Sequence, residues 1–263
     1  MSERLQISVK DHVAQVTLNR PEKHNAVDMQ TFDELGSIGD RLASEPTVRA
    51  VVLSGAGENF CAGIDTSIFT EAGGKIDPAS MAPVEGSLAN RFQRAAIVWR
   101  ELQVPVICAI QGVAFGAGAQ IALGADLRYS SPDAKLSIME VRWGLIPDLG
   151  ISVTARNLLR WDRLRDLAYS GRIVDGREAS EIGLVTEVHD DPLAAAQATA
   201  AEIARRSPDA IRAMKRMFNE CQELDTGASL ALEAKLQMRV MGGPNQREAV
   251  RANVAGKEPN FQD

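Results

Sequence analysis

Two turns built from small residues constrain the fold of this chain more than any other feature. Residues 60–65 (FCAGID) follow the strand-like run 50–53, and residues 112–120 (GVAFGAGAQ) follow the strand-like run 105–110. Small residues let a backbone turn sharply and approach other groups closely. Two such turns can each direct a backbone N–H at one point, and a pair of converging N–H groups stabilises a carbonyl oxygen on which negative charge builds. The alternative is that both turns are tight only because a strand meets a helix there.

Composition limits the classes of protein to which the chain can belong. Its 263 residues suffice for one large core, or for a core with an appendage. The net charge of −6 disfavours nucleic acid as a partner, because phosphate binding requires a basic surface. Three separated cysteines, the lack of an apolar signal core and the lack of a long apolar window favour a cytoplasmic protein with no membrane partner.

The periodicity of apolar residues predicts an α/β fold. We expect helices from Asp28, over 86–103, from Ala117 and over most of the chain after Ser152; the expected strands are 4–9, 12–18, 49–54, 105–110, 126–130, 135–138 and 184–188. Residues 66–86 have no period, and we expect a long mobile loop there. Strands alternating with helices, followed by helices alone, predict an α/β core in residues 1–200 and a C-terminal helical subdomain in residues 201–263.

Several familiar cofactor and metal motifs are missing or broken. Residues 116–121 begin like a dinucleotide-binding turn, but Ile121 stands where a small residue is needed. There is no P-loop and no Gly-x-Ser-x-Gly turn, and His12, His24 and His189 lack the spacing of metal ligands. We therefore expect no metal.

The chain resembles the crotonase superfamily of enoyl-CoA hydratases and isomerases in the order and spacing of many short motifs. These motifs are residues 19–26, 60–65, 105–112, 116–118, 125–128, Glu140, 144–147, 170–172, 178–179 and 183–185. The resemblance implies a spiral of ββα units with a C-terminal helical region for oligomerisation into trimers, or hexamers made of two trimers. It also implies an acyl-CoA thioester substrate, whose coenzyme A is part of the substrate, and no separate cofactor.

By position, the resemblance assigns the oxyanion-hole N–H groups to Ile64 and Ala117. Ala117 also begins a predicted helix, where the helix dipole favours negative charge. Because backbone atoms donate these bonds, alanine in place of the family's usual glycine does not remove the donor.

The acid and base groups differ from those of the hydratases that the chain resembles. Hydratases place one carboxylate at the position of Gln120 and a second at the position of Glu140. A carboxamide forms hydrogen bonds but cannot accept a proton at neutral pH. Ordinary hydration would therefore lack one of its two acids. The alternative for Glu140 is a purely structural role.

Asp148 lies eight residues after Glu140, which is the arrangement of dienoyl-CoA isomerases. Those enzymes carry a third acid at the position of Gln120, so this chain has two of the three. Two acids suit the removal of a proton at one carbon and its return at another. The alternative is that Asp148 caps the helix expected near Ser152, or pairs with Arg142 or Arg156.

The resemblance also implies contacts with the substrate around the two turns and at the rim. The Arg20–Lys23 loop would lie near the adenine and pantetheine of coenzyme A, and Lys257 would contact the coenzyme of a neighbouring subunit. Both lysines could equally be solvated surface residues. The expected substrate-binding residues are Arg20, Lys23, Ala62, Gly63, Asp65, Gly116, Trp143 and Lys257. The acyl pocket would be lined by residues 66–103, where Phe92, Ala96 and Trp99 face either the pocket or the core.

Three functions are compatible with these sequence features. Double-bond isomerisation by a Glu140/Asp148 proton shuttle is favoured. The first alternative is hydration by Glu140 with Gln120 positioning the water. The second is a catalytically silent acyl-CoA-binding scaffold, although such a protein has no need for two neighbouring acids.

Overall fold

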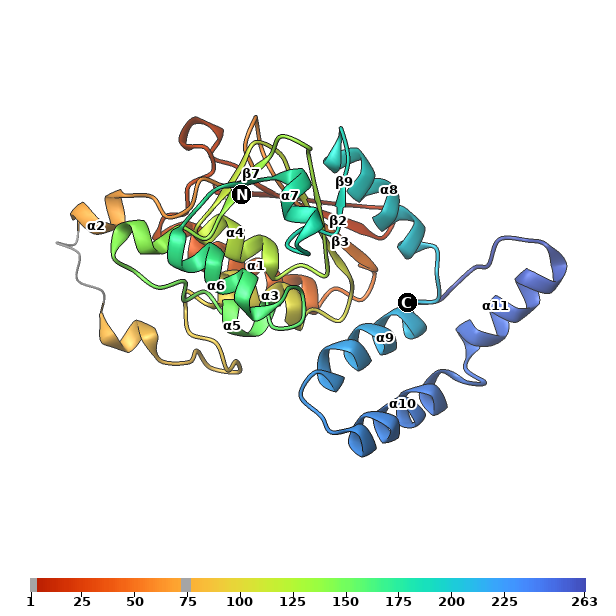
Figure 1. The fold of residues 1–263 in the computed structure, drawn as a ribbon. Coiled ribbons are helices and arrows are strands. Elements are labelled where there is room, and N and C mark those ends of the chain that lie inside the picture. The colour runs from red at the N-terminus through yellow and green to blue at the C-terminus, as the bar shows by residue number, and fades with distance from the viewer. Residues whose placement is uncertain (1–3, 72–76) are drawn as a thin grey trace.

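A six-stranded sheet forms the centre of the fold in the computed structural model, which describes residues 4–71 and 77–263 (Figure 1). Its strands lie in the order β1-β2-β3-β4-β6-β9, and only β1 and β2 pair antiparallel. Their bounds are β1 Leu5–Lys10, β2 Val13–Leu18, β3 Ala50–Gly55, β4 Val106–Ile110, β6 Leu127–Ser130 and β9 Glu187–Val188. The β1–β2 turn places Asp11 and His12 at φ 48° and 66°, the left-handed conformation that a tight hairpin requires.

A three-stranded sheet lies beside the first turn. It consists of β5 Val113–Phe115, β7 Lys135–Ser137 and β8 Val174–Asp175, in the order β5-β7-β8. A parallel bridge between Cys61 and Ala114 connects the first turn to β5. Strand β8 interrupts the helical region that we expected after Ser152.

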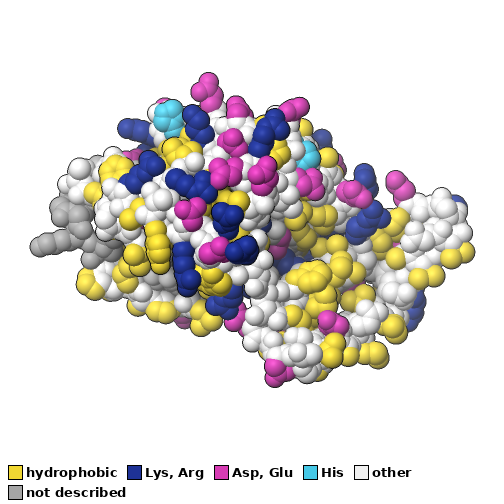
Figure 2. Space-filling view, viewed as in Figure 1, with side chains coloured by type: hydrophobic (Ala, Val, Ile, Leu, Met, Phe, Trp, Pro, Cys, Tyr) yellow, Lys and Arg dark blue, Asp and Glu magenta, His cyan; other side chains and the backbone are white. Residues whose placement is uncertain are grey.

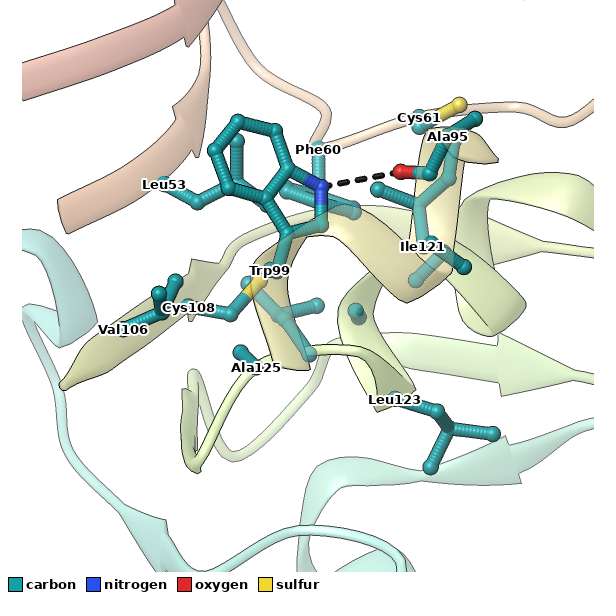
Figure 3. Packing of buried hydrophobic residues seen from close by; sticks show 14 of the residues in the cluster. Leu53, Phe60, Cys61, Ala95, Trp99, Val106, Cys108, Ile121, Leu123 and Ala125 are labelled. Carbon is teal, nitrogen blue, oxygen red and sulfur yellow. Dashed lines mark hydrogen bonds between the residues drawn. The ribbon is translucent and has the colours of Figure 1, made fainter. Parts of the chain in front are cut away.

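Helices cover both faces of the large sheet. On one face α8, Pro192–Ala204, presents Ala196, Ala200 and Ala204 to the sheet, and these small side chains at four-residue spacing let the helix lie close to it. On the other face the indole of Trp99 is buried beside Leu53 and Phe60, and its N–H donates to the Ala95 carbonyl over 2.8 Å (Figure 3).

The remaining helices of the core range from 4 residues in α5 to 15 residues in α1. Their bounds are α1 Met29–Ala43, α2 Ser67–Glu71, α3 Arg94–Glu101, α4 Ala117–Leu123, α5 Ile151–Thr154, α6 Trp161–Ser170 and α7 Gly176–Glu181. Three 3-10 turns accompany them: η1 Pro21–Lys23, η2 Pro78–Met81 and η3 Glu140–Trp143.

Three C-terminal helices extend away from the core: α9 Pro208–Cys221, α10 Thr226–Val240 and α11 Pro244–Ala255 (Figure 1). Hydrophobic side chains gather on the surface of this part of the molecule (Figure 2). Large apolar residues there are strongly exposed, including Phe218 (62%), Met238 (71%) and Val254 (85%). Because α8 packs on the sheet as far as Ala204, a boundary at residue 200 falls inside that helix, and the extension begins at α9.

The expected hairpin and the helix after Asp28 are confirmed. The Asp28 carboxylate accepts the N–H of Thr31 and so caps α1. The helix expected over 86–103 begins only at Arg94, because the side chain of Asn90 accepts the N–H groups of Phe92 and Gln93 and holds residues 90–93 in a turn.

Residues 66–86 are not one long loop, since α2 and η2 lie within them. The glycines and lysine at 73–75, which suggested mobility, lie outside the described residues.

Candidate active site

One cavity of about 300 Å³ opens between the two small-residue turns. The loop before α1, both turns, α2 and η3 contribute its wall. It is lined by Lys23, Ala26, Ala62, Gly63, Ile64, Asp65, Thr66, Phe69, Phe115, Gly116, Ala117, Met139, Glu140, Trp143 and Leu145. Nine of the residues expected to bind substrate or act in catalysis meet here: Lys23, Ala62, Gly63, Ile64, Asp65, Gly116, Ala117, Glu140 and Trp143.

The first turn depends on a glycine. Gly63 has φ +99°, and a Cβ added to it would lie 2.8 Å from the carbonyl oxygen of Phe115 and 3.9 Å from the nitrogen of Ala117. The two turns thus approach each other at Gly63. On either side of Ile64, the Gly63 carbonyl accepts from Val27 and the Asp65 N–H donates to Val27. Among the described residues, the N–H of Ile64 itself has no acceptor.

The second turn ends where α4 begins. Gly116 has φ +50°, and Ala117 is the first residue of the helix, so its N–H has no partner within the helix. One residue further, a Cβ on Gly118 would lie 2.5 Å from the carbonyl oxygen of Cys61. This close contact holds the start of α4 against the first turn. The N–H of Ala117, like that of Ile64, has no acceptor in the described part of the chain.

Glu140 is an ionisable residue of the cavity wall and lies beside Gly116. It begins η3, is 7% exposed, and its Oε1 lies 3.3 Å from where a Cβ on Gly116 would be. Oε1 accepts a hydrogen bond of 2.5 Å from Gln120, whereas Oε2 is buried without a partner. Burial raises the pKa of Glu140, the charge of Asp148 raises it further, and the Gln120 bond offsets part of this rise.

Gln120 lies behind Glu140 and does not line the cavity. It is 1% exposed on α4, and both ends of its carboxamide are used by the protein. Its Nε2 donates to Glu140, and its Oε1 accepts the N–H of Leu149 over 2.9 Å. The structure therefore places Gln120 beside the acid and away from the space for a water or substrate.

Asp148 is half-buried near Glu140 but is absent from the cavity wall. Burial raises its pKa. Asp148 neither caps the following helix nor pairs with an arginine among the described residues, the two structural roles considered for it. The cap residue of α5 is Gly150, with no side-chain cap, and Arg156 pairs with Glu223. In the described chain, Asp148 forms no ion pair with Arg142.

Two expected substrate contacts lie elsewhere. Arg20 is 9% exposed and donates to the carbonyl of Ala26 and the carboxylate of Asp65, at 2.6 and 2.9 Å. Arg20 thus fixes the cavity wall from behind instead of reaching into the cavity. Lys257 is exposed beyond α11 and does not line the cavity within this chain.

The aromatic residues at the cavity differ from those expected. Phe92, Ala96 and Trp99 are buried in the core, so the core alternative holds for all three. The cavity instead contains Phe69 and Phe115, together with Met139 and Leu145. Their positions follow from the folding of α2, β5 and η3 around the turns, and no local sequence pattern separates them from core residues.

Two kinds of feature are missing from the described residues. No group of histidine, cysteine and carboxylate side chains there is arranged to hold a metal ion. Within the same residues, no helix has both the length and the apolar character needed to cross a bilayer.

The fold and the cavity define an enzyme class that comparison with known proteins identifies. Residues 8–263 match the family model described as enoyl-CoA hydratase/isomerase. The chain belongs to this family, within the crotonase superfamily, and is an enzyme of the hydratase/isomerase class acting on acyl-CoA thioesters.

Both activities occur among its relatives. The chain is 31% identical to the 1,2-epoxyphenylacetyl-CoA isomerase of Escherichia coli, over 99% of each chain. It is 35% identical to the mitochondrial Δ(3,5)-Δ(2,4)-dienoyl-CoA isomerase of Mus musculus, over 79% of this chain and 66% of that protein. A solved enoyl-CoA hydratase from Mycobacterium tuberculosis H37Rv superimposes with a TM-score of 0.87 at 26% identity, covering 99% of both chains.

Proposed function

We propose that this protein is an enoyl-CoA isomerase that moves a double bond through an enolate. The observation that carries the proposal is that Glu140, whose buried Oε2 has no partner, lines the same cavity as Ile64 and Ala117, whose N–H groups have no acceptor among the described residues. A thioester oxygen bound by both amides would have its developing charge stabilised. One such donor contributes about 3–4 kcal/mol to the transition state.

The proposed reaction balances with one carboxylate. With a 3-enoyl thioester, Oε2 of Glu140 takes a proton from C2, and the electron pair delocalises into a dienolate held at the oxyanion hole. The same oxygen then returns the proton at C4, which leaves a 2-enoyl thioester and an ionised Glu140. Its raised pKa suits the first step, because it makes the carboxylate a stronger base than an exposed glutamate.

Asp148 acts on Glu140 through its charge in this proposal. It contributes to the raised pKa of Glu140 and lies away from the cavity wall. We expect Asp148→Asn to move the acid limb of the kcat/KM profile to lower pH and to leave the plateau within about tenfold of wild type. A plateau loss of 10²-fold or more would instead make Asp148 the second proton carrier of a two-acid shuttle.

A substrate panel tests the reaction. We would incubate the protein with 2-enoyl-, 3-enoyl- and 3,5-dienoyl-CoA and follow absorbance and product mass. Isomerisation predicts products of unchanged mass from a 3-enoyl or dienoyl substrate. Products that have gained one water from 2-enoyl-CoA would support hydration instead. Binding of all three esters without turnover would support the scaffold alternative.

Coenzyme and partner contacts complete the proposal. Lys23 lines the cavity and would bind a phosphate of coenzyme A, and Lys257 would reach the coenzyme of a neighbouring subunit. The exposed apolar residues of α9–α11 would form the interface of a homotrimer, alone or paired as a hexamer. We place this enzyme in cytoplasmic fatty acid metabolism, with no cofactor beyond the substrate's coenzyme A.

A further inference from the structure

The carboxamide of Gln120 has only one orientation that satisfies both of its partners. The N–H of Leu149 can only donate, so the oxygen of Gln120 must face it, at 2.9 Å. Its NH₂ group must then face Glu140, at 2.5 Å. Gln120 is 1% exposed, so water cannot readily replace either partner.

This orientation makes the two oxygens of Glu140 unequal. A group that only donates faces Oε1, and a carbonyl-type oxygen accepts such a bond better than a hydroxyl oxygen does, so Oε1 is favoured as the unprotonated oxygen of the acid. A proton on Glu140 is therefore favoured on Oε2, the buried oxygen without a partner. A carboxylate at position 120 would not favour one oxygen of Glu140 in this way, because two facing carboxylates would share a proton between them.

We propose that Gln120 is a positioning residue that favours the proton of Glu140 on Oε2, so that the same oxygen takes and returns the substrate proton. The catalytic consequence of this inference rests on the proposed isomerisation. The two hydrogen bonds of Gln120, to Glu140 and from Leu149, which we call the clamp, are a property of the free protein. The bond to Leu149 extends the clamp to the segment that carries Asp148, so Gln120 also fixes the spacing of the two acids.

The first test measures the clamp without any reaction. Gln120→Met keeps the length of the side chain and removes the donor. Carbon-13 NMR of labelled glutamate, with the Glu140 signal assigned from its loss in Glu140→Gln, follows the titration of this carboxyl. We expect Gln120→Met to raise the pKa of Glu140 above that of wild type, because the lost bond favours the ionised form.

Ser137→Ala is the matched control. It removes another buried side-chain hydrogen bond, from Ser137 to the Gly171 carbonyl, without touching Glu140. We expect the titration of Glu140 to remain at its wild-type position in this control. An unchanged titration in Gln120→Met, with the fold retained by circular dichroism, would overturn the clamp whatever reaction the protein catalyses.

The second test concerns proton return. A 3-enoyl-CoA deuterated at C2 is converted in ordinary water, and the product is analysed for deuterium at C4. We expect wild type to transfer part of the label. For Gln120→Met we expect less transfer, a kcat lower by about 10- to 100-fold, a KM within about twofold of wild type, and an acid limb at higher pH.

The two failures are distinguishable. If wild type does not isomerise the substrate, the proposed function fails, whereas the NMR titration still decides the clamp. Wild-type label transfer and an unmoved acid limb in Gln120→Met would overturn the single-oxygen shuttle even if isomerisation is confirmed.

Discussion

The two oxygens of Glu140 have different surroundings: one accepts from Gln120, and the other is buried without a partner. Burial makes ionisation of this carboxyl unfavourable in the folded protein, so its pKa there exceeds the value of 4.5 expected when unfolded. The folded protein thus holds a carboxyl that binds its proton more tightly than a free glutamate does, at the cost of some stability.

Glu140→Gln should separate the catalytic role of this carboxyl from its cost in stability. The amide keeps the bond from Gln120 through its oxygen and carries no charge to bury. Above the folded pKa of Glu140, wild type carries the full cost of the buried charge, and this cost disappears as pH falls below 4.5. We therefore expect the variant to be more stable than wild type to urea at pH 7 and equal to it at pH 4, with activity lower by about 10²–10⁴-fold.

Equal stability differences at both pH values would contradict the buried-charge explanation. Unfolding of Asp33→Asn serves as the control, because Asp33 is an exposed carboxylate paired with Arg91 at the surface. For this control we expect no comparable gain in stability at pH 7.

At the level of single residues, the sequence predicts backbone roles better than side-chain roles. Ile64, Ala117 and Gly63 meet at the cavity because turn geometry alone places their backbones there. Side chains such as Arg20 and Gln120 find partners on segments distant in sequence, which periodicity and motif spacing do not reveal. Arg20 was expected at the substrate and instead supports the wall.

The two turns act together because their backbones are in close contact. Gly63 approaches Phe115 and Gly118 approaches Cys61, so a side chain at either glycine would force the turns apart. This contact sets the separation of the free N–H groups of Ile64 and Ala117. The catalytic geometry therefore depends on where α4 begins relative to the first turn.

Gly118→Ala should disturb this geometry. Its Cβ would lie 2.5 Å from the Cys61 carbonyl, too close to be accommodated without movement of the backbone. We expect a stability loss of about 1–3 kcal/mol and a fall in kcat of about 10²-fold, measured by urea unfolding and steady-state kinetics.

Gly227→Ala is the matched control, since a Cβ there has only the Asp225 side chain at 3.4 Å. It should leave kcat unchanged and leave stability equal or slightly higher, as alanine favours helices. Wild-type kcat in Gly118→Ala would show that the contact between the turns does not set the catalytic geometry.

Sequence periodicity located the hairpin and α1 closely, but placed the start of α3 too early. The difference arises at Asn90, whose side chain caps a local turn and so prevents a continuous helix. Strand β8 has only two residues and pairs antiparallel with β7. Its formation therefore depends on this tertiary pairing, and no local sequence pattern predicts it.

The whole molecule is a sheet core joined to a helical extension, and a buried lysine connects the two. Lys215 on α9 is 6% exposed, and its ammonium donates to the carbonyls of Trp99 and Val104 and to Asp126, at 2.9, 2.8 and 2.7 Å. These three bonds use all of its donors. The position of α9 on the core is thus determined by charge as well as by packing.

Lys215→Met should weaken this connection. Removing the ammonium leaves two carbonyls and a carboxylate without their donor, which we expect to cost about 3 kcal/mol in the free energy of unfolding. Lys10→Met, at an exposed position on β1, should change it by less than about 0.5 kcal/mol. Urea unfolding of both variants compares them, and equal effects would contradict the role given to Lys215.

The overall architecture was the feature most accessible from sequence, because many short motifs in a fixed order constrain a whole chain. The family match over residues 8–263 confirms that inference. The proposed oligomer, in contrast, rests on apolar residues of α9–α11 whose exposure depends on how the helices fold, and the sequence alone does not predict that exposure.

Solvent deuterium exchange tests the central claim most directly, namely that Glu140 moves a proton on a thioester enolate. A 3-enoyl-CoA is incubated in deuterated water with wild type or with Glu140→Gln, and deuterium at C2 and C4 is followed by mass spectrometry and NMR. We predict incorporation with wild type and a loss of at least 10²-fold in its rate with the variant. Incorporation at the wild-type rate in Glu140→Gln would contradict the account.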